Sequence, residues 1–318
     1  MKNKNWCYIF TVLSALFFSN DVFSQNNTTY SFLNLDAGAR ASALAGSFSS
    51  NTNDVMSIFY NPAALSTLNK SQVNAGFYKY LLDINAGNAA YGQKLKNSGY
   101  IGAGIRYINY GSFDKFDEQS NNLGTFSANE LALSLGYSNV YSKNFHYGIN
   151  MKFIYSGIDE FTSTGLAADI GILYLIPSTQ WNFGLSLLNA GFQLSEYNTT
   201  KEDLPVDLRV AVSKKLEHLP LNIHFEFDNL VSYEENFFDR FKNLSIGGEF
   251  DLSDYVQFRL GYDNSLRQDL KTGSSLGIAG FSAGFGIKFL ESYSLDYSFN
   301  SMGNVGSTQS FNIGYNWK

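Results

Sequence analysis

Large apolar residues recur at every second position along most of the chain after about residue 71. In residues 147–155 the odd positions hold Tyr, Ile, Met, Phe and Tyr, whereas the even positions include Gly, Asn and Lys. The same alternation is clear in residues 181–187, 221–228, 256–263, 293–300 and 310–317. Successive side chains of a strand point to opposite faces, so each run predicts a strand with one apolar and one polar face.

A soluble β-sandwich would alternate in the same way, but two features favour a membrane barrel. The runs are mostly about ten residues long, whereas soluble strands usually have five or six. Their apolar face is uniformly large and often carries Tyr or Trp near its ends, as an aromatic girdle does. We therefore predict an all-β fold, a transmembrane antiparallel β-barrel of about fourteen strands. The expected strand centres are residues 75, 88, 104, 132, 150, 169, 185, 210, 224, 248, 259, 281, 296 and 312.

The connections between these runs alternate in length. Short connections are expected near Lys96, Ser142, Ser178, Leu219, Ser253 and Glu291, and longer ones near Asp117, Asp159, Thr199, Asn236, Leu270 and Gly303. The first hairpin, near Leu81, is a short exception on the side of the long connections. Bacterial barrels have short periplasmic turns and long outer loops, so both ends of the barrel segment are expected in the periplasm.

Residues 25–70 lack the alternation and precede the expected barrel of residues 71–318. Residues 39–46 are mostly small, and residues 54–60 could form a short helix that Asn61-Pro62 would break. We expect residues 25–70 to form a hatch folded into the lumen. A periplasmic arm is the alternative.

The first 24 residues read as a cleavable signal peptide for export to the outer membrane. Lys2 and Lys4 precede an apolar run from Trp6 to Phe18, and the small residue Ser24 precedes the expected cleavage point. A membrane anchor is the alternative, but the run is shorter than the ~20 residues needed to span a bilayer. No later apolar stretch is long enough for a transmembrane helix.

Composition agrees with a barrel and excludes some chemistry. The chain has 21 Tyr and 28 Phe, residues that favour strands, and its mean hydropathy of −0.15 fits strands with one polar face. The formal net charge of −6 argues against binding to nucleic acid. The single cysteine, Cys7, lies in the expected signal peptide, so we expect no disulfide or thiol chemistry in the mature chain.

Residues 280–284 spell the nucleophile-elbow pattern Gly-x-Ser-x-Gly around Ser282. An elbow needs a strand, a sharp turn and a helix, and in hydrolases of this class a histidine follows the serine. Here the pattern lies inside an alternating run, and no histidine follows Ser282. We interpret these glycines as easing strand curvature or close packing with the hatch. We therefore expect no catalytic site.

His224, Glu226 and Asp228 share one face of a strand and could form a metal site or an acid–base group. The alternative, which we favour, is a polar cluster on the lumen wall whose charges pair with neighbours such as Arg209. We expect neither a metal nor a cofactor. The other two histidines, at 146 and 218, lie near turns and are expected to be solvated.

Two further groups are candidates for binding rather than chemistry. Arg40 is a lone cation among the small residues of the expected hatch, and we expect it to anchor the hatch to a lumen carboxylate. The loop of residues 233–241 carries Phe237, Phe238 and Phe241 beside several charges. Exposed aromatics beside charge are typical of a docking surface or a membrane-interface contact. A loop folded over the barrel mouth is the alternative.

Several stretches resemble the PorV/PorQ family, barrels of the FadL-like class that accompany the type IX secretion system. The N-terminal ones are residues 32–35 (FLNL), 39–46 (ARASALAG) and 61–65 (NPAAL). Stretches that look more like PorQ than PorV are residues 108–111 (INYG), 124–128 (GTFSA), 152–156 (KFIYS), 213–216 (SKKL) and 279–286 (AGFSAGFG). The loop near Asn236 is shorter than we expect of PorQ, which leaves contacts through that loop in doubt.

The resemblance implies a fourteen-stranded barrel with an N-terminal hatch, Arg40, Asn61 and Pro62 lying in its hatch motifs. It also implies a non-enzymatic role in protein secretion and cell-surface attachment. Its implied partners are outer-membrane lipid, proteins like PorU, PorV and PorZ, and cargo with C-terminal sorting domains. The alternative function is a FadL-like channel for small hydrophobic molecules. A lipid-modifying enzyme is a third reading, which lacks a convincing nucleophile and base.

Overall fold

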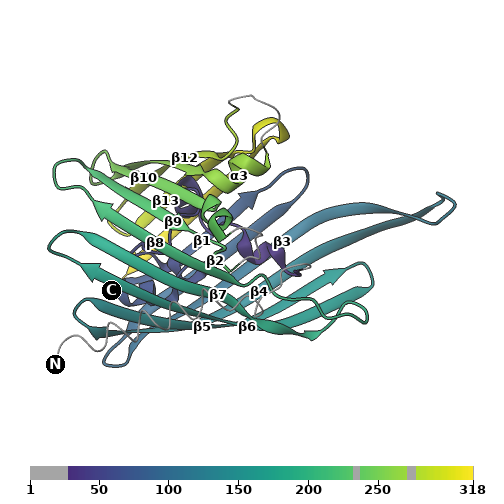
Figure 1. Ribbon diagram of the computed structural model, residues 1–318, viewed down its shortest axis with the longest axis horizontal. Coiled ribbons are helices and arrows are strands. Elements are labelled where there is room, and N and C mark those ends of the chain that lie inside the picture. Colours follow the sequence, from purple (N-terminus) through teal and green to yellow (C-terminus); the bar gives the residue numbers. More distant parts are fainter. Residues whose placement is uncertain (1–27, 232–236, 271–276, 318) are drawn as a thin grey trace.

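The computed structural model describes residues 28–231, 237–270 and 277–317. The expected signal peptide with Cys7, and residues 233–236 of the aromatic loop, lie outside the described residues. Fourteen antiparallel strands close into a barrel (Figure 1). They are β1 (Ser71–Lys79), β2 (Asn85–Leu95), β3 (Gly99–Phe116), β4 (Asn122–Ser142), β5 (Phe145–Ile158), β6 (Phe161–Ile176), β7 (Trp181–Ser195), β8 (Asp207–Lys215), β9 (Leu221–Phe227), β10 (Leu244–Asp251), β11 (Val256–Asp263), β12 (Phe281–Phe289), β13 (Tyr293–Ser301) and β14 (Ser307–Trp317).

Each strand pairs with its sequence neighbours, and β1 closes the barrel against β14, from Ser71↔Trp317 to Lys79↔Gln309. This closure leaves the sheet without a free edge along the barrel wall, which a membrane-spanning sheet requires. The predicted all-β barrel is confirmed, and every predicted strand centre falls within a strand.

The two faces of the wall differ as the alternation predicts. In β5 the outward Met151 is 56% exposed and Ile149 is 44% exposed, whereas the inward Asn150 and Lys152 are 0% and 5% exposed. An apolar outer belt of this kind is what a barrel presents to lipid. The polar inner residues are buried because the lumen is filled.

The two ends of the barrel differ in shape. The β3–β4 hairpin, with strands of 18 and 21 residues, projects far beyond the wall at the end opposite the C-terminus (Figure 1). The long connections, residues 196–206 and the described parts of 228–243 and 264–280, lie at the same end as this hairpin. Three predicted long connections are short. β5 and β6 are joined only by Asp159 and Glu160, because the strands themselves continue outward. The connections near Asp117 (residues 117–121) and Gly303 (residues 302–306) are no longer than the predicted short connection near Leu219 (residues 216–220).

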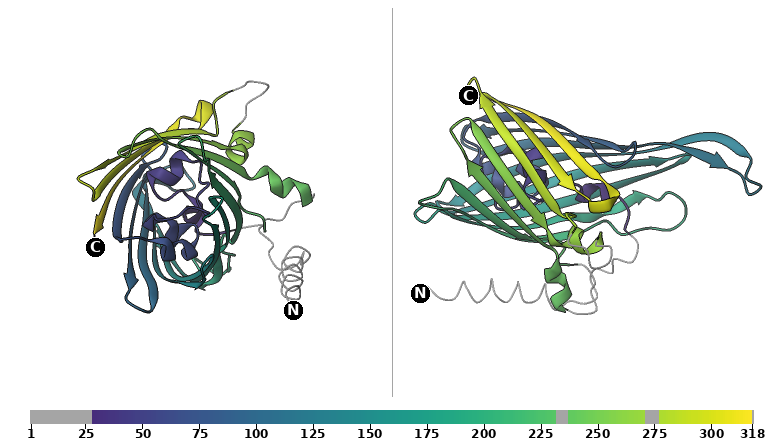
Figure 2. Two further views of the ribbon diagram at one scale, coloured as in Figure 1. Left: turned by 90° about the vertical axis from the view of Figure 1, so that its left-hand side faces the viewer. Right: turned by 90° about the horizontal axis from the view of Figure 1, so that it is seen from above.

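Residues 28–70, which we call the hatch, lie inside the barrel (Figure 2). They form the short helices η1 (Ser31–Asn34), α2 (Ala39–Ala43), η2 (Val55–Phe59) and η3 (Pro62–Thr67). The remaining short helices, η4 (Phe237–Lys242), α3 (Asn264–Asp269) and η5 (Gly303–Val305), lie in the connections between strands. No helix in the described part of the chain is long and apolar enough to cross a membrane.

The helix expected near residues 54–60 is η2, a 3₁₀ helix whose N-terminus is capped by the Asp54 side chain. Asn61-Pro62 ends it and also begins η3, with the Asn61 side chain as cap and Pro62 in the first turn. The hatch carries the main apolar core, including Leu44, Phe48, Ile58 and Leu65, all 0% exposed.

Inward-facing glycines let the hatch backbone touch the wall. A Cβ atom added at Gly148 would lie 2.5 Å from the backbone nitrogen of Ala63, and one at Gly261 would lie 2.6 Å from that of Ala45. Side chains of η2 and η3, among them Leu65, lie equally close to other inward glycines. The wall glycines in contact with the hatch are Gly92, Gly102, Gly104, Gly136, Gly148, Gly165, Gly171, Gly184, Gly247, Gly261 and Gly284. The hatch is therefore seated against the wall on many sides.

Candidate functional site

Arg40, in helix α2, points to the wall and meets the carboxylate of Glu249 on β10. Its Nε and NH2 donate to the two Glu249 oxygens at 2.8 and 2.7 Å, and NH1 donates to Asp54 at 3.0 Å. Burial by itself would lower the Arg40 pKa, but the neighbouring carboxylates of Glu249 and Asp54 raise it above its ordinary value. Arg40 thus makes the kind of contact expected of a hatch anchor.

Glu249 is shared between the hatch and the wall. Arg259 on β11 donates its Nε to Glu249 at 2.6 Å and its NH1 to Asp296 on β13 at 2.6 Å. The chain of charges therefore runs from Asp54 through Arg40, Glu249 and Arg259 to Asp296. Such alternation satisfies buried charges whose isolation would be costly.

Asn61 and Pro62 hold the next turn of the hatch. The Asn61 amide donates to the carbonyls of Ser49 at 2.8 Å and of Ile172, on β6, at 3.0 Å. The Asn61 side-chain oxygen accepts from the Ala63 backbone at 3.1 Å, and Pro62 packs against Gly148 and Gly171. One buried side chain thus joins two hatch segments and the wall.

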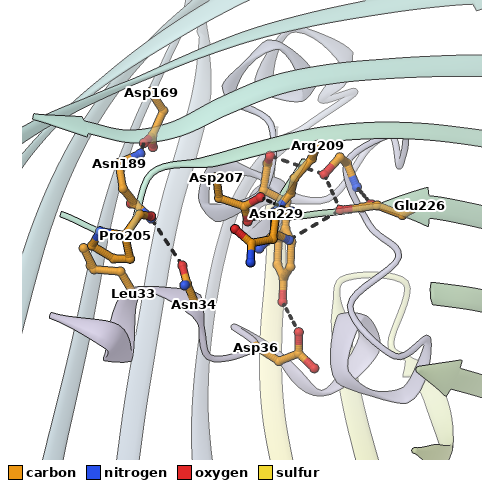
Figure 3. Close-up of polar contacts among 12 residues, drawn as sticks. Leu33, Asn34, Asp36, Asp169, Asn189, Pro205, Asp207, Arg209, Glu226 and Asn229 are labelled. Atoms are coloured by element: carbon orange, nitrogen blue, oxygen red, sulfur yellow. Dashed lines mark hydrogen bonds and ion pairs between the residues drawn. The ribbon is translucent and has the colours of Figure 1, made fainter. Parts of the chain in front are cut away.

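Glu226 binds the hatch through Ser49 (Figure 3). Its two oxygens accept hydrogen bonds from the Ser49 backbone and hydroxyl, each at 2.8 Å, and Arg209 on β8 lies 3.4 Å away. Arg209 also donates to Asp207 at 2.6 Å, and Asp207 accepts from the Asn229 backbone at 2.6 Å. The carboxylates near Arg209 are therefore held by hydrogen bonds as well as charge.

The other two members of the predicted lumen cluster, His224 and Asp228, do not share the contacts of Glu226 with Ser49. His224 is fully buried, and its ring nitrogens have no hydrogen-bond partner among the described residues. Asp228 lies one residue beyond β9, where burial and then the like charge of Asp207 raise its pKa well above the ordinary value. Within the described residues, no group of three His, Cys, Asp or Glu side chains is placed to hold a metal.

A fully buried polar group on β5, β6 and β7 was not anticipated from the sequence. Lys152 Nζ lies 2.9 Å from Asp169 and donates to Asn189 at 2.6 Å. The Asn189 amide donates to the Pro205 carbonyl at 3.0 Å and to Asn34 of the hatch at 3.4 Å (Figure 3). Asn189 sits at an irregularity in the β6–β7 pairing with φ of 58°, which no strand pattern signals.

Buried groups also lie within the hatch itself. The Tyr60 hydroxyl donates to Asp36 at 3.2 Å, and burial raises the pKa of the Asp36 carboxyl above its ordinary value. His146 corrects an expectation, because it is only 7% exposed and shares a 2.6 Å hydrogen bond with Ser66 of η3. His218 is exposed, as expected.

Ser282 has a structural partner. It lies on the inner face of β12, and its hydroxyl donates to the Ala43 carbonyl of the hatch at 3.1 Å. A Cβ atom at Gly284 would lie 2.5 Å from the Ala43 side chain. Gly284 of the elbow-like sequence therefore allows close packing with helix α2, in agreement with our interpretation, whereas Gly280 lies against Asp263 and Arg267.

The aromatic loop ends in η4, at the end of the barrel that carries the β3–β4 hairpin and the long connections, which we call the outer end. Phe238 is 80% exposed and Phe241 is 40% exposed, and the Phe241 ring packs edge-on against Phe227 with centroids 5.5 Å apart. Phe237 begins η4, but its side chain lies outside the described part of the structure. The role of these residues in docking stays a prediction.

Three cavities flank the hatch. A polar cavity of about 350 Å³ lies at the end with the short connections, and a second of about 310 Å³ lies on the opposite side of the hatch, near Asp228 and Asp263. A third, of about 580 Å³, lies at the outer mouth and is lined by aromatic side chains that include Tyr30, Phe113 and Phe126.

Comparison with known proteins assigns both the sequence family and the fold. The model of the family described as type IX secretion system protein PorV matches residues 20–255. No curated protein matches the chain in sequence.

Solved FadL-like barrels share the fold at low sequence identity. The toluene transporter TodX of P. putida is 11% identical, with a TM-score of 0.58 over 88% of this chain and 98% of that chain. The toluene transporter TbuX of Ralstonia pickettii is 10% identical, with a TM-score of 0.59 over 89% and 98%. A Pseudomonas aeruginosa FadL homologue is 11% identical, with a TM-score of 0.56 over 88% and 98%. At such identities the likeness shows the fold alone.

Proposed function

Because the chain belongs to the PorV family of type IX secretion system proteins, we propose that it is a non-enzymatic outer-membrane component of that secretion and surface-attachment machinery. The observation that carries the proposal beyond family membership is the seated hatch. Its backbone lies against inward glycines, and its Arg40 binds Glu249 of the wall. A lumen filled in this way favours a scaffold that binds partners at its two mouths over an open conduit.

Several finer features belong to the same proposal. Residues 1–24 direct export, residues 25–70 are the hatch and residues 71–318 the barrel. The partners are outer-membrane lipid and proteins like PorU, PorV and PorZ, together with cargo that carries C-terminal sorting domains. Within the family we favour PorQ, because residues 124–128, among other stretches, look more like PorQ than PorV.

The test is a clean deletion in the native host, followed by measurement of sorting-domain cargo on the cell surface and in the medium. We expect cargo to be lost from the surface, either trapped or released unanchored, and restored by the wild-type gene. Unchanged surface cargo would overturn the proposal. Loss that the wild-type gene does not restore would point to an effect on neighbouring genes.

A channel for small hydrophobic molecules is the second candidate, favoured by the aromatic cavity at the outer mouth. The cavity is bounded by Tyr30, Tyr110, Phe113 and Phe126, which would suit an apolar ligand. Uptake of a radiolabelled monoaromatic compound by the wild-type and deletion strains tests this candidate. Equal uptake by the two strains would dismiss it.

A further inference from the structure

The polar cavity at the short-connection end is a pocket closed at its inner side, which we call the vestibule. Hatch residues 51–54 form one side, and the ends of β8–β14 and β1 form the other. Its inner limit is the charge chain of Arg40, Glu249 and Arg259, beyond which the hatch packs on the wall. Its volume of about 350 Å³ would hold about ten water molecules.

The charges that line the vestibule are largely satisfied by one another. Arg40, Arg259, Lys215 and Lys288 are balanced by Asp54, Glu249, Asp251 and Asp296, so four cations minus four anions leaves no net charge. Ion pairs of 2.6–3.0 Å join most of them, including Lys215 to Asp251 at 2.9 Å. The vestibule is therefore not built to attract an ion of either sign.

Its carboxamide side chains, in contrast, have unused hydrogen-bonding capacity. Asn222, Gln257 and Asn316 line the vestibule, and their side chains form no hydrogen bond with another described residue. Asn51 is only 3% exposed, and its Nδ2 has no partner within the described structure. A buried donor without a partner is unfavourable, but so little of Asn51 Nδ2 is accessible that a ligand would meet chiefly Asn222, Gln257 and Asn316.

We propose that the vestibule binds an extended, uncharged tail of a partner protein presented from the short-connection side. A carboxamide offers one donor group and one acceptor in a plane, which matches the N–H and C=O of a peptide backbone. Oligosaccharides have similar polar groups but are usually bound against aromatic rings, and no described aromatic residue lines the vestibule. Because the inner side is closed, the tail stays docked and does not pass through. The partner's identity rests on the proposed function, but the recognition chemistry does not.

The test uses the full chain in detergent and a pool of fluorescent, uncharged hexapeptides as the probe. Asn222→Leu combined with Gln257→Leu keeps the side-chain volume but removes two sets of hydrogen bonds, so we expect affinity to fall about tenfold. Asn97→Leu, in an exposed turn at the same end, is the matched control and should bind like wild type. Folding of each variant is verified by its far-ultraviolet circular dichroism spectrum.

No saturable peptide binding, or equal binding by the double variant and wild type, would overturn the proposal. Tighter binding of fluorescent maltohexaose than of the peptides would overturn it in favour of a saccharide site. In cells, the double variant and the wild-type gene are compared for their restoration of surface cargo to a deletion strain. Equal restoration would refute peptide binding by the vestibule and leave the proposed function intact. Unchanged cargo after deletion would refute the proposed function, while peptide binding in vitro would still decide the vestibule.

Discussion

The close contact between Gly148 and the hatch backbone predicts that a larger residue at this position lowers the stability of the chain. A methyl group at Gly148 would lie 2.5 Å from the Ala63 nitrogen and about as close to the Pro62 carbonyl, both of them backbone atoms that cannot rotate away. Overpacking of this kind costs about 1–3 kcal/mol, so Gly148→Ala should lower the free energy of unfolding by that amount. Some of the cost would be offset because alanine loses less backbone entropy on folding.

Gly248 is the matched control, because it lies one position from Gly247 and on the opposite face of β10. The nearest atom to a Cβ there is 3.5 Å away, an ordinary contact, so Gly248→Ala should stabilise the chain by about 0.4–1 kcal/mol. Urea unfolding in detergent micelles, followed by circular dichroism and tryptophan fluorescence, would measure both. If Gly148→Ala is as stable as wild type or more so, the hatch backbone does not lie against the wall at Gly148.

Three further predictions concern charge and exposure. Burial raises the pKa of Asp36, so the wild-type chain should lose stability as the pH rises from the ordinary carboxyl value of 3.8 through the raised pKa. The melting temperature of Asp36→Asn, measured relative to wild type across a pH series, should therefore rise over the same range. Arg40→Met and Glu249→Met should each lower the free energy of unfolding by roughly 1–3 kcal/mol, less than for a fully buried ion pair because Arg40 is partly exposed. A double-mutant cycle that shows no coupling between the two sites would contradict the role of Arg40 as an anchor. Phe238→Ala should leave the melting temperature unchanged but reduce surface cargo. Leu252→Ala, at a site that is 66% exposed at the other end of the barrel, should affect neither.

The barrel was predictable because its signal is local. Every second residue of a strand faces lipid, so runs such as residues 147–155 carry the alternation whatever lies across the lumen. The wrong expectation at Asp159 has a local cause too: β5 and β6 continue as a paired ribbon past the wall, and polar residues there read as a loop.

The lumen was predictable only in part. Arg40 stood out as a cation among small residues, and its meeting with a wall carboxylate follows from the cost of an unpaired buried charge. Which carboxylate it meets depends on the rotation of the hatch within the barrel, and nothing in the sequence specifies that angle. The expectation that His146 is solvated was wrong because a position near a turn is solvated only if the lumen beside it is empty. Here Ser66 of the hatch covers it.

Polar groups on the inner wall form two kinds of contact, which bears on where partners can bind. Glu226, Glu249 and Asn150 each bond the hatch, so they are committed to holding it. Side chains near the rim with the short connections, such as Asn222 and Gln257, have no such partner. A moving plug would need wall contacts that exchange readily, whereas contacts through backbone atoms at Gly148 and Gly261 leave no clearance for sliding. Binding at that rim, with the hatch fixed in place, is therefore the arrangement that these contacts favour.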